Sequence, residues 1–446
     1  MSESFDLLIA GGRAVTPSGV EQVDIGVRDG RIVALGALEG AAAAETIKAE
    51  NLHVLPGVID TQVHFREPGL EHKEDLESGA AGAILGGVTT VFEMPNTKPN
   101  TLTADAINDK LARAKGRMWC DHAFFIGAAG ENAENLATLE LLPGCCGVKV
   151  FMGSSTGNLL VPDDDTLRRV LRSGRRRVAI HAEDEPRLIA RKDIAEKAGH
   201  PRAHPEWRDV ESGVLATKRC LAVARETGRQ VHVLHVTTAD EMEILGRNKD
   251  IATVEVTPQH LTLFAPDCYD RLGSFAQMNP PIRDEAHREG LWRAVASGIV
   301  DVLGSDHAPH TREEKAQPYP KSPSGMTGVQ TLLPVMLDHV HRGRLSLERL
   351  VDLTGHGPQR IYNIAGKGRI AVGYDADLVI VDLKAERTIT ASWIASKTGW
   401  TPFEGMKVTG WPLMTLLRGR VVMREDQRIG GAMGAPVRFL DTLSRN

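Results

Sequence analysis

The sequence predicts an α/β fold: a parallel (β/α)8 barrel joined to a small composite β-sandwich that both termini build. Short apolar segments typical of buried strands alternate with helical segments through the middle of the 446-residue chain. Both ends of the chain are instead rich in short strands. The length suits one barrel of about 250 residues with an accessory module. We therefore expect the barrel at residues 53–369 and the β-sandwich at residues 1–52 and 370–446.

Eight apolar segments are candidates for the barrel strands. They are residues 54–65, 89–95, 121–128, 147–152, 177–182, 230–237, 252–257 and 301–305. Several stretches between them carry helical periodicity, among them residues 101–116 and residues 162–173. The second of these stretches begins with Pro162 and three acidic residues, which favours a helix start. A doubly wound open sheet is the alternative, but its Gly-rich phosphate-binding turn is missing after the first strand.

The strands of the two termini are expected to share one small sheet structure. Residues 5–15 and 23–36 form short strands near the start, and the second pair has the hairpin signal Asp29-Gly30. Residues 375–383 and 414–425 repeat the pattern near the end. Two-stranded units are marginally stable alone, so a composite of both ends is the economical arrangement.

Composition and charge exclude several classes of protein. The net charge of −5 gives no electrostatic case for binding nucleic acid or an anionic membrane. No apolar run approaches the roughly 20 residues that span a bilayer, and the N-terminus does not resemble a secretory signal. The five cysteines show no CxxC spacing, which indicates reduced thiols. We therefore predict a cytoplasmic protein with a small-molecule substrate.

Polar side chains recur where the predicted barrel strands end. In such a barrel the active site lies at the C-terminal ends of the strands. The residues found there are His64, Asn96, Lys149, His181, His235 and Asp306. Three imidazoles, an amine and a carboxylate at one mouth are hard to explain as packing. Two other histidines are expected to be structural: His122 begins a strand, and His232 lies three residues before His235, so strand alternation would point it the opposite way.

Lys149 and Asp306 are the most informative of these residues. Lys149 stands inside the apolar segment GVKVFMG, where a free ammonium is costly to bury. It either reaches the rim or pairs with an acid such as Asp306, or it is carbamylated and serves as an anionic metal ligand. Asp306 either anchors a loop or binds metal and transfers protons, and the histidines favour the second role.

Several motifs together resemble the dihydroorotases of the amidohydrolase superfamily, a group of cyclic amidohydrolases. The matching segments are HFREPG (64–69), HKED (72–75), EMPNT (93–97), GVKVFMG (147–153), IHAEDE (180–185), LHVTT (234–238), MNPPIR (278–283) and SDHAPH (305–310). The tail GRIAVGYDADLVIVD (368–382) is a wider feature of the superfamily. The resemblance runs over about residues 5–425, and the combination is far more specific than any one motif.

The resemblance implies a TIM-like barrel and a metal-dependent hydrolase. It implies one or two zinc ions per chain, with the ligands His64, carbamylated Lys149, His181, His235 and Asp306 and with Gln62 as a further candidate. The substrate-binding residues it implies are Arg66, Asn96, Asn279 and His310. The implied reaction is the reversible hydrolysis of (S)-dihydroorotate to N-carbamoyl-L-aspartate in de novo pyrimidine (UMP) biosynthesis. A metal-activated hydroxide would attack, and Asp306 would act as general base and then as general acid.

One departure from the family pattern concerns a metal ligand. The family usually reads His-x-His at the first strand, whereas this chain has Gln62, Val63 and His64. An amide oxygen is a weaker zinc donor than an imidazole, so we expect one tight metal site and one loose one. Gln259 and Gln330 also differ from the frequent family residues, but neither position is a family ligand.

Two rival functions stay open at this point. Another cyclic amidase, such as a dihydropyrimidinase, hydantoinase or allantoinase, shares the metal chemistry, and Arg66, Asn96 and Asn279 speak against it. A non-catalytic scaffold subunit of aspartate transcarbamoylase is the second rival, and Gln62 gives it some weight. Expected assemblies are a homodimer and, as a further option, a complex with aspartate transcarbamoylase. Residues 311–330 are a candidate closing loop.

Overall fold

Eight parallel strands form a nearly closed barrel in the computed structural model, which describes residues 4–155 and 159–443. The strands follow one another in chain order and are β8 (Val58–Val63), β9 (Val88–Glu93), β10 (Asp121–Gly127), β11 (Cys145–Phe151), β12 (Val178–His181), β13 (Val231–Val233), β14 (Ala252–Val256) and β15 (Val302–Leu303). A parallel bridge between Val63 and His307 links the last segment to the first strand. The predicted barrel is confirmed, and each predicted segment overlaps one strand of the barrel.

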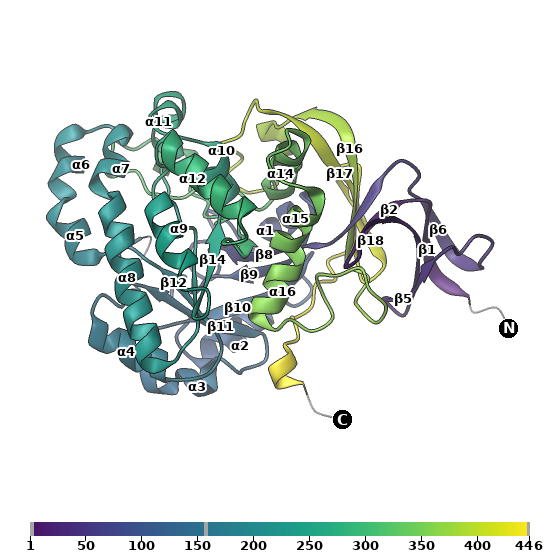
Figure 1. The fold of residues 1–446 in the computed structure, drawn as a ribbon, viewed down its shortest axis with the longest axis horizontal. Coiled ribbons are helices and arrows are strands. Elements are labelled where there is room, and N and C mark those ends of the chain that lie inside the picture. Colours follow the sequence, from purple (N-terminus) through teal and green to yellow (C-terminus); the bar gives the residue numbers. More distant parts are fainter. Residues whose placement is uncertain (1–3, 156–158, 444–446) are drawn as a thin grey trace.

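Helices surround the barrel on its outer side (Figure 1). They are α1 (Leu76–Leu85), α2 (Ala104–Ala114), α3 (Leu136–Leu139), α4 (Asp164–Arg172), α5 (Glu185–Ala190), α6 (Lys192–Ala198), α7 (His204–Trp207), α8 (Val210–Thr227), α9 (Ala239–Gly246), α10 (Pro258–Thr262), α11 (Asp267–Leu272), α12 (Glu285–Ala296), α13 (Arg312–Lys315), α14 (Leu332–His341), α15 (Leu347–Val351) and α16 (Gly357–Tyr362). Side-chain caps start several of them, such as Thr103 for α2 and Asp163 for α4. No helix in the described part of the chain is long and apolar enough to cross a membrane.

Two further sheets lie beside the barrel, at the right of Figure 1. The four-stranded sheet contains β1 (Phe5–Ala10), β4 (Asp24–Arg28), β5 (Arg31–Gly36) and β6 (Ala43–Lys48). The seven-stranded sheet contains β2 (Arg13–Thr16), β3 (Gly19–Gln22), β7 (His53–Pro56), β16 (Leu378–Thr388), β17 (Lys407–Leu417), β18 (Arg420–Arg424) and β19 (Gln427–Arg428). Apolar residues of both sheets share one core, so both ends of the chain build this unit, as predicted.

The boundary between the two units falls inside a single apolar run. Residues 54–65 form two strands: β7 pairs with β2 and β16 of the seven-stranded sheet, whereas β8 opens the barrel. Only Gly57 separates them, and an added Cβ there would collide with the Thr89 side chain. The division at residues 52 and 370 stays a proposal, and its outermost residues 1–3 and 444–446 lie outside the described chain.

A buried cluster of charges joins the small sheets to the barrel. Lys367 forms ion pairs with Asp121 of β10, with Asp377, and with Asp375 at 3.4 Å. Arg418 donates to Asp121 at 2.6 Å. All three carboxylates are buried, so the two cations balance negative charge that would be costly to leave alone.

Replacing Lys367 by Met should destabilise the protein strongly, because it removes the one cation that pairs with all three buried carboxylates in the described structure and leaves only Arg418 and, 3.6 Å from Asp375, Arg438. We expect a loss of about 3–5 kcal/mol in the free energy of unfolding, measured by urea denaturation. Lys197→Met is the matched control, because Lys197 is exposed and pairs with Asp193 of its own helix; its effect should stay within about 0.5 kcal/mol. A Lys367 variant as stable as the control would contradict this account.

Candidate active site

The predicted site residues come together at the C-terminal ends of the barrel strands. One cavity there is lined by Gln62, His64, Arg66, Asn96, His181, His235, Asn279 and Asp306, together with Phe151, Ser155, Ala308, Ser324 and Gly325. Lys149 and His310 lie directly beside this lining, Lys149 with its Nζ 4.5 Å from the centre of the Phe151 ring. The structure therefore brings the whole predicted set together, although it tests none of the assigned roles.

His181 and His235 form the best-ordered pair of the site. His181 Nδ1 lies 3.1 Å from His235 Nε2, and the other nitrogen of His181 donates to Glu183 at 2.8 Å. Arg208 in turn donates to Glu183 at 2.5 Å. Burial opposes the charge on Glu183, but Arg208 and His181 hold the pKa of this carboxyl well below its usual range. The carboxylate thus fixes the proton on His181 Nε2 and leaves the Nδ1 lone pair directed toward His235.

Asp306 is the centre of a second polar group on the opposite side. Its Oδ1 lies 3.3 Å from His64 Nε2 and accepts a hydrogen bond from Gln62 Nε2 at 3.1 Å. His64 Nδ1 lies 2.7 Å from Asn96 Oδ1. Gln62 and His64 flank Val63, so both side chains leave the same face at the end of β8.

Lys149 lies in the barrel interior between these groups. Its side chain is fully buried, and its Nζ makes no hydrogen bond to any part of the chain that the structure describes. Burial lowers its pKa to about 7, against the attraction of Asp306 and Glu255. Burial also lowers the pKa values of His64, His181 and His235, and the Lys149 ammonium contributes in each case. The imidazoles are therefore neutral, which is the form that binds metal.

Three site residues have a strained backbone. Arg66, His235 and Asp306 adopt positive φ angles of 66°, 36° and 44°. This left-handed region costs side-chain-bearing residues about 1–3 kcal/mol each. Such strain is concentrated at functional sites, and here it directs three of the predicted side chains toward one cavity.

His232 does not lie where strand alternation placed it. Lys149, Ala179, His232 and Thr253 are lateral neighbours in register across four adjacent strands, so their side chains share the inner face of the barrel. The alternation argument is wrong because β13 ends at Val233 and the chain turns before His235. His232 contacts Thr253 Oγ1 at 2.8 Å. It supports the layer beneath the cavity, which agrees with a structural role.

Arg66 is a buried cation at the wall of the cavity. It is 1% exposed, and it donates to the Pro309 carbonyl at 3.1 Å. His310 Nε2 lies 3.3 Å from the guanidinium and 3.0 Å from the Ser324 carbonyl, while its Nδ1 faces Lys73 Nζ at 3.1 Å. His310 therefore contacts the Arg66 guanidinium, and its predicted contact with substrate stays a prediction.

Asn279 is oriented by a residue that the sequence did not single out. His204 is buried, and its Nε2 lies 3.1 Å from the Met278 carbonyl and 3.0 Å from Asn279 Oδ1. A carbonyl can only accept, so His204 Nε2 carries the proton and donates to both oxygens. Burial and Arg208 lower the pKa of His204 to about 3, which keeps the ring neutral. The Asn279 amide nitrogen consequently faces the cavity, 3.4 Å from Ser155 Oγ.

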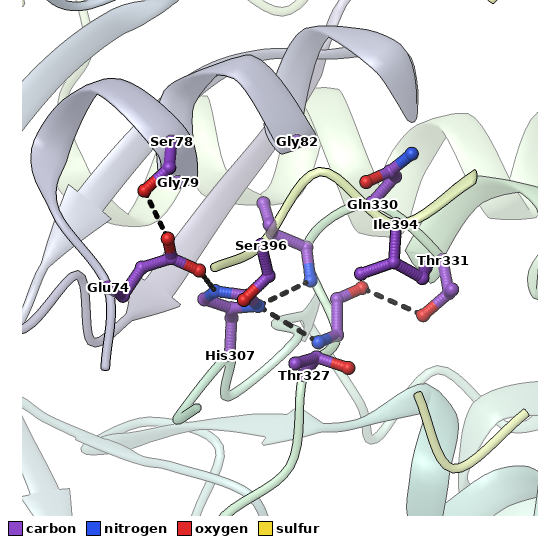
Figure 2. Close-up of a pocket in the computed structure, with 12 residues that line it drawn as sticks. Glu74, Ser78, Gly79, Gly82, His307, Thr327, Gln330, Thr331, Ile394 and Ser396 are labelled. Atoms are coloured by element: carbon purple, nitrogen blue, oxygen red, sulfur yellow. Dashed lines mark hydrogen bonds and ion pairs between the residues drawn. The ribbon is translucent and has the colours of Figure 1, made fainter. Parts of the chain in front are cut away.

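A buried pair braces the loop that carries Asp306 (Figure 2). His307 Nδ1 accepts from the backbone N–H groups of Gly328 and Val329, so its Nε2 holds the proton and faces Glu74 at 3.4 Å. These residues line a small cavity against α1, separate from the main site. Glu74 and His307 belong to the segments HKED and SDHAPH, and this membership was the available signal for them.

The side chains also allow a test of whether a metal fits. Among residues 4–155 and 159–443, no group of three or more His, Cys, Asp and Glu side chains is arranged to hold an ion. Lys149 Nζ is buried and, like His235 Nδ1, has no hydrogen-bond partner among the described residues. The two imidazoles nevertheless face each other as a pair, with His181 Nδ1 3.1 Å from His235 Nε2. A divalent metal fits this pair once Lys149 supplies a third, anionic donor.

Comparison with known proteins decides the family. Residues 53–422 match the amidohydrolase family. The chain belongs to the amidohydrolase family. A dihydroorotase of Halobacterium salinarum is 40% identical over 409 residues, which cover 90% of this chain and 94% of that protein. A dihydroorotase of Pyrococcus abyssi is 36% identical and covers 92% of this chain and 93% of that protein.

A solved structure supports the same family at the level of the fold. The L-hydantoinase (dihydropyrimidinase) from Arthrobacter aurescens has a TM-score of 0.92 at 32% identity, covering 97% of this chain and 100% of that chain. The predicted membership in the cyclic amidohydrolases is thereby confirmed. This amidohydrolase is similar both to proteins that are named for dihydroorotate and to one that is named for hydantoins.

Proposed function

We propose that this amidohydrolase is a dihydroorotase, which reversibly hydrolyses (S)-dihydroorotate to N-carbamoyl-L-aspartate in de novo pyrimidine (UMP) biosynthesis. The observation that carries the proposal is Arg66: a buried guanidinium lines the same cavity as the histidines and Asp306. Within the described chain Arg66 donates to the Pro309 carbonyl and lies 3.3 Å from His310 Nε2, and no carboxylate pairs with it. An unpaired buried cation favours an anionic ligand such as the carboxylate of dihydroorotate.

The other polar residues of the cavity fit the remaining parts of the substrate. Arg66 and Asn96 would hold the carboxylate, with His310 and Lys73 supporting Arg66 from behind. Asn279 would donate its amide N–H to a ring carbonyl, because His204 fixes that orientation. Holding the ring at two ends orients its amide bond relative to Asp306.

We propose zinc as the resident metal, with His181, His235 and a carbamylated Lys149 as its principal ligands. A bound divalent metal polarises a carbonyl group and lowers the pKa of water. Carbamylation joins the Lys149 nitrogen to the carbon of CO2 with loss of a proton. It converts a buried amine that has no hydrogen-bond partner among the described residues into an anionic oxygen donor, which removes the cost of burying a cation.

Asp306 is the proposed proton carrier. Its carboxylate would accept a proton from the attacking water as the oxygen bonds to the ring carbonyl carbon beside the methylene group. The bond from that carbon to the ring nitrogen then breaks, and Asp306 returns the proton to this nitrogen. The products are the ureido group and the new carboxylate of carbamoyl-aspartate. The hydrogen bond from Gln62 Nε2 keeps the Asp306 carboxylate in place during both transfers.

A hydantoinase or dihydropyrimidinase activity is the second candidate, because the similar solved structure bears those names. A neutral ring would leave Arg66 buried without an anionic partner, and the dihydroorotase relatives therefore carry more weight. The homodimer, the complex with aspartate transcarbamoylase and the scaffold role stay predictions without a test in this structure.

The purified protein with added zinc should hydrolyse dihydroorotate and leave dihydrouracil, hydantoin and allantoin essentially untouched. Arg66→Gln should lower kcat/KM for dihydroorotate by about 100- to 1,000-fold, since it removes a charged contact worth about 3–4 kcal/mol. Circular dichroism and metal content serve as controls that the variant is folded and loaded. Turnover restricted to the neutral rings would show that the carboxylate pocket is misassigned.

His204→Ala should raise KM about 5- to 30-fold with little change in kcat. Asn279 loses its orienting donor, so it binds the substrate and the transition state less tightly by the same amount. His204→Gln is the rescue variant, since its side-chain amide can donate to the same oxygens. A fall in kcat at constant KM would instead place His204 in the chemical step.

A further inference from the structure

Gln62 occupies the position where the family usually has the first histidine of its His-x-His pair. The side chain is 1% exposed and lines the main cavity. Its Nε2 donates to Asp306 Oδ1 at 3.1 Å, and its Oε1 has no hydrogen-bond partner among the described residues. The amide is therefore oriented by its nitrogen, which points at the carboxylate.

This orientation is unsuited to metal binding. An amide nitrogen is a donor without an available lone pair, so Gln62 could bind a metal only through Oε1. Turning the amide to bring Oε1 to Asp306 would break the 3.1 Å hydrogen bond and place two oxygens against each other. The remaining ligands on this side would then be one imidazole, His64, and oxygen donors, a set that zinc binds less tightly than a pair of imidazoles.

On the opposite side of the cavity, a pair of imidazoles is present and further side chains hold it in place. His181 and His235 place two nitrogens 3.1 Å apart, and Glu183 and Arg208 fix the orientation of His181. Carboxylates that hold a ligating histidine in this manner strengthen metal binding. The second nitrogen of His64 instead faces the neutral side chain of Asn96.

We propose that this chain holds one tightly bound divalent metal, at His181, His235 and Lys149, and that Gln62 takes the place of a second metal by hydrogen-bonding Asp306. The inference rests on the proposed metal-dependent function. In this arrangement the Gln62 N–H group holds the Asp306 carboxylate in position, where a second cation would otherwise do so. A histidine at position 62 would restore the imidazole pair and with it the second site.

The test is the number of metal ions that the full-length protein retains. Wild type, Gln62→His and Gln259→His are loaded with Zn²⁺, dialysed against metal-free buffer and analysed by inductively coupled plasma mass spectrometry. Gln259→His is the matched control: this buried glutamine also stands where the family often has histidine, but it donates to the Ser305 carbonyl outside the proposed ligand set. We expect about one zinc per chain in the wild type and the control, and about two in Gln62→His.

A Co²⁺-loaded sample gives a second readout that needs no variant. The wild type should show the electron paramagnetic resonance of an isolated high-spin ion, whereas Gln62→His should show coupling between two neighbouring ions. Two retained ions in the wild type would overturn the inference and leave the proposed function intact. No retained ion in folded wild type would contradict the metal-dependent function itself. One retained ion per chain in folded Gln62→His would also overturn the inference, because Gln62 would then not be the residue that limits the number of bound metal ions.

Discussion

The burial of Lys149 is the constraint on which the rest of this site depends. An ammonium group removed from water costs several kcal/mol unless a charge or hydrogen bonds compensate it. Lys149 Nζ has no hydrogen bond within the described chain, and the neighbouring Asp306 and Glu255 act on it only through their charge. Burial lowers its pKa to about 7, and burial raises that of Glu255 to about 8. A barrel interior with this composition favours a chemical change at the lysine over a permanent free charge.

The surrounding structure holds the site rigidly at the cost of local strain. Backbone hydrogen bonds join the strand ends that carry the site, such as His64 N–H to the His307 carbonyl at 2.7 Å and Met94 N–H to the Val63 carbonyl at 2.8 Å. Arg66 and Asp306, which adopt left-handed conformations, lie within two residues of the first of these bonds. Further from the cavity, Arg208 orients Glu183, and Glu74 faces His307. The first pair orients His181, which lines the cavity. The second pair braces the loop that carries Asp306.

Much of the barrel could be predicted because each strand is a short apolar run and the site lies at the strand ends. Polar residues after apolar runs, such as His181 and Asp306, were therefore identified without a structure. Residues 54–65 look like one strand in the sequence but form two, because β7 and β8 are both apolar and only Gly57 separates them. His232 was placed on the wrong face, because alternation fails where the chain turns after Val233.

The contacts that support the site residues could not be predicted from the sequence, for a different reason. His204 and Asn279 are 75 residues apart, and Glu74 and His307 are 233 residues apart, so no local pattern connects them. Such pairs arise from the tertiary fold, where the closed barrel brings its loops together at one mouth. The sequence also indicated that Gln62 weakens one metal site, but only the structure revealed its hydrogen bond to Asp306.

The most direct test of this account is whether Lys149 carries a carbamate. The zinc-loaded protein would be incubated with ¹³C-labelled bicarbonate and studied by ¹³C NMR, with Lys149→Met as the control. The account predicts one carbamate signal per chain in the wild type, absent from the control and lost when the metal is removed. A fully metal-loaded wild type without that signal would contradict it, because Lys149 would then be a buried amine that does not take part in metal binding.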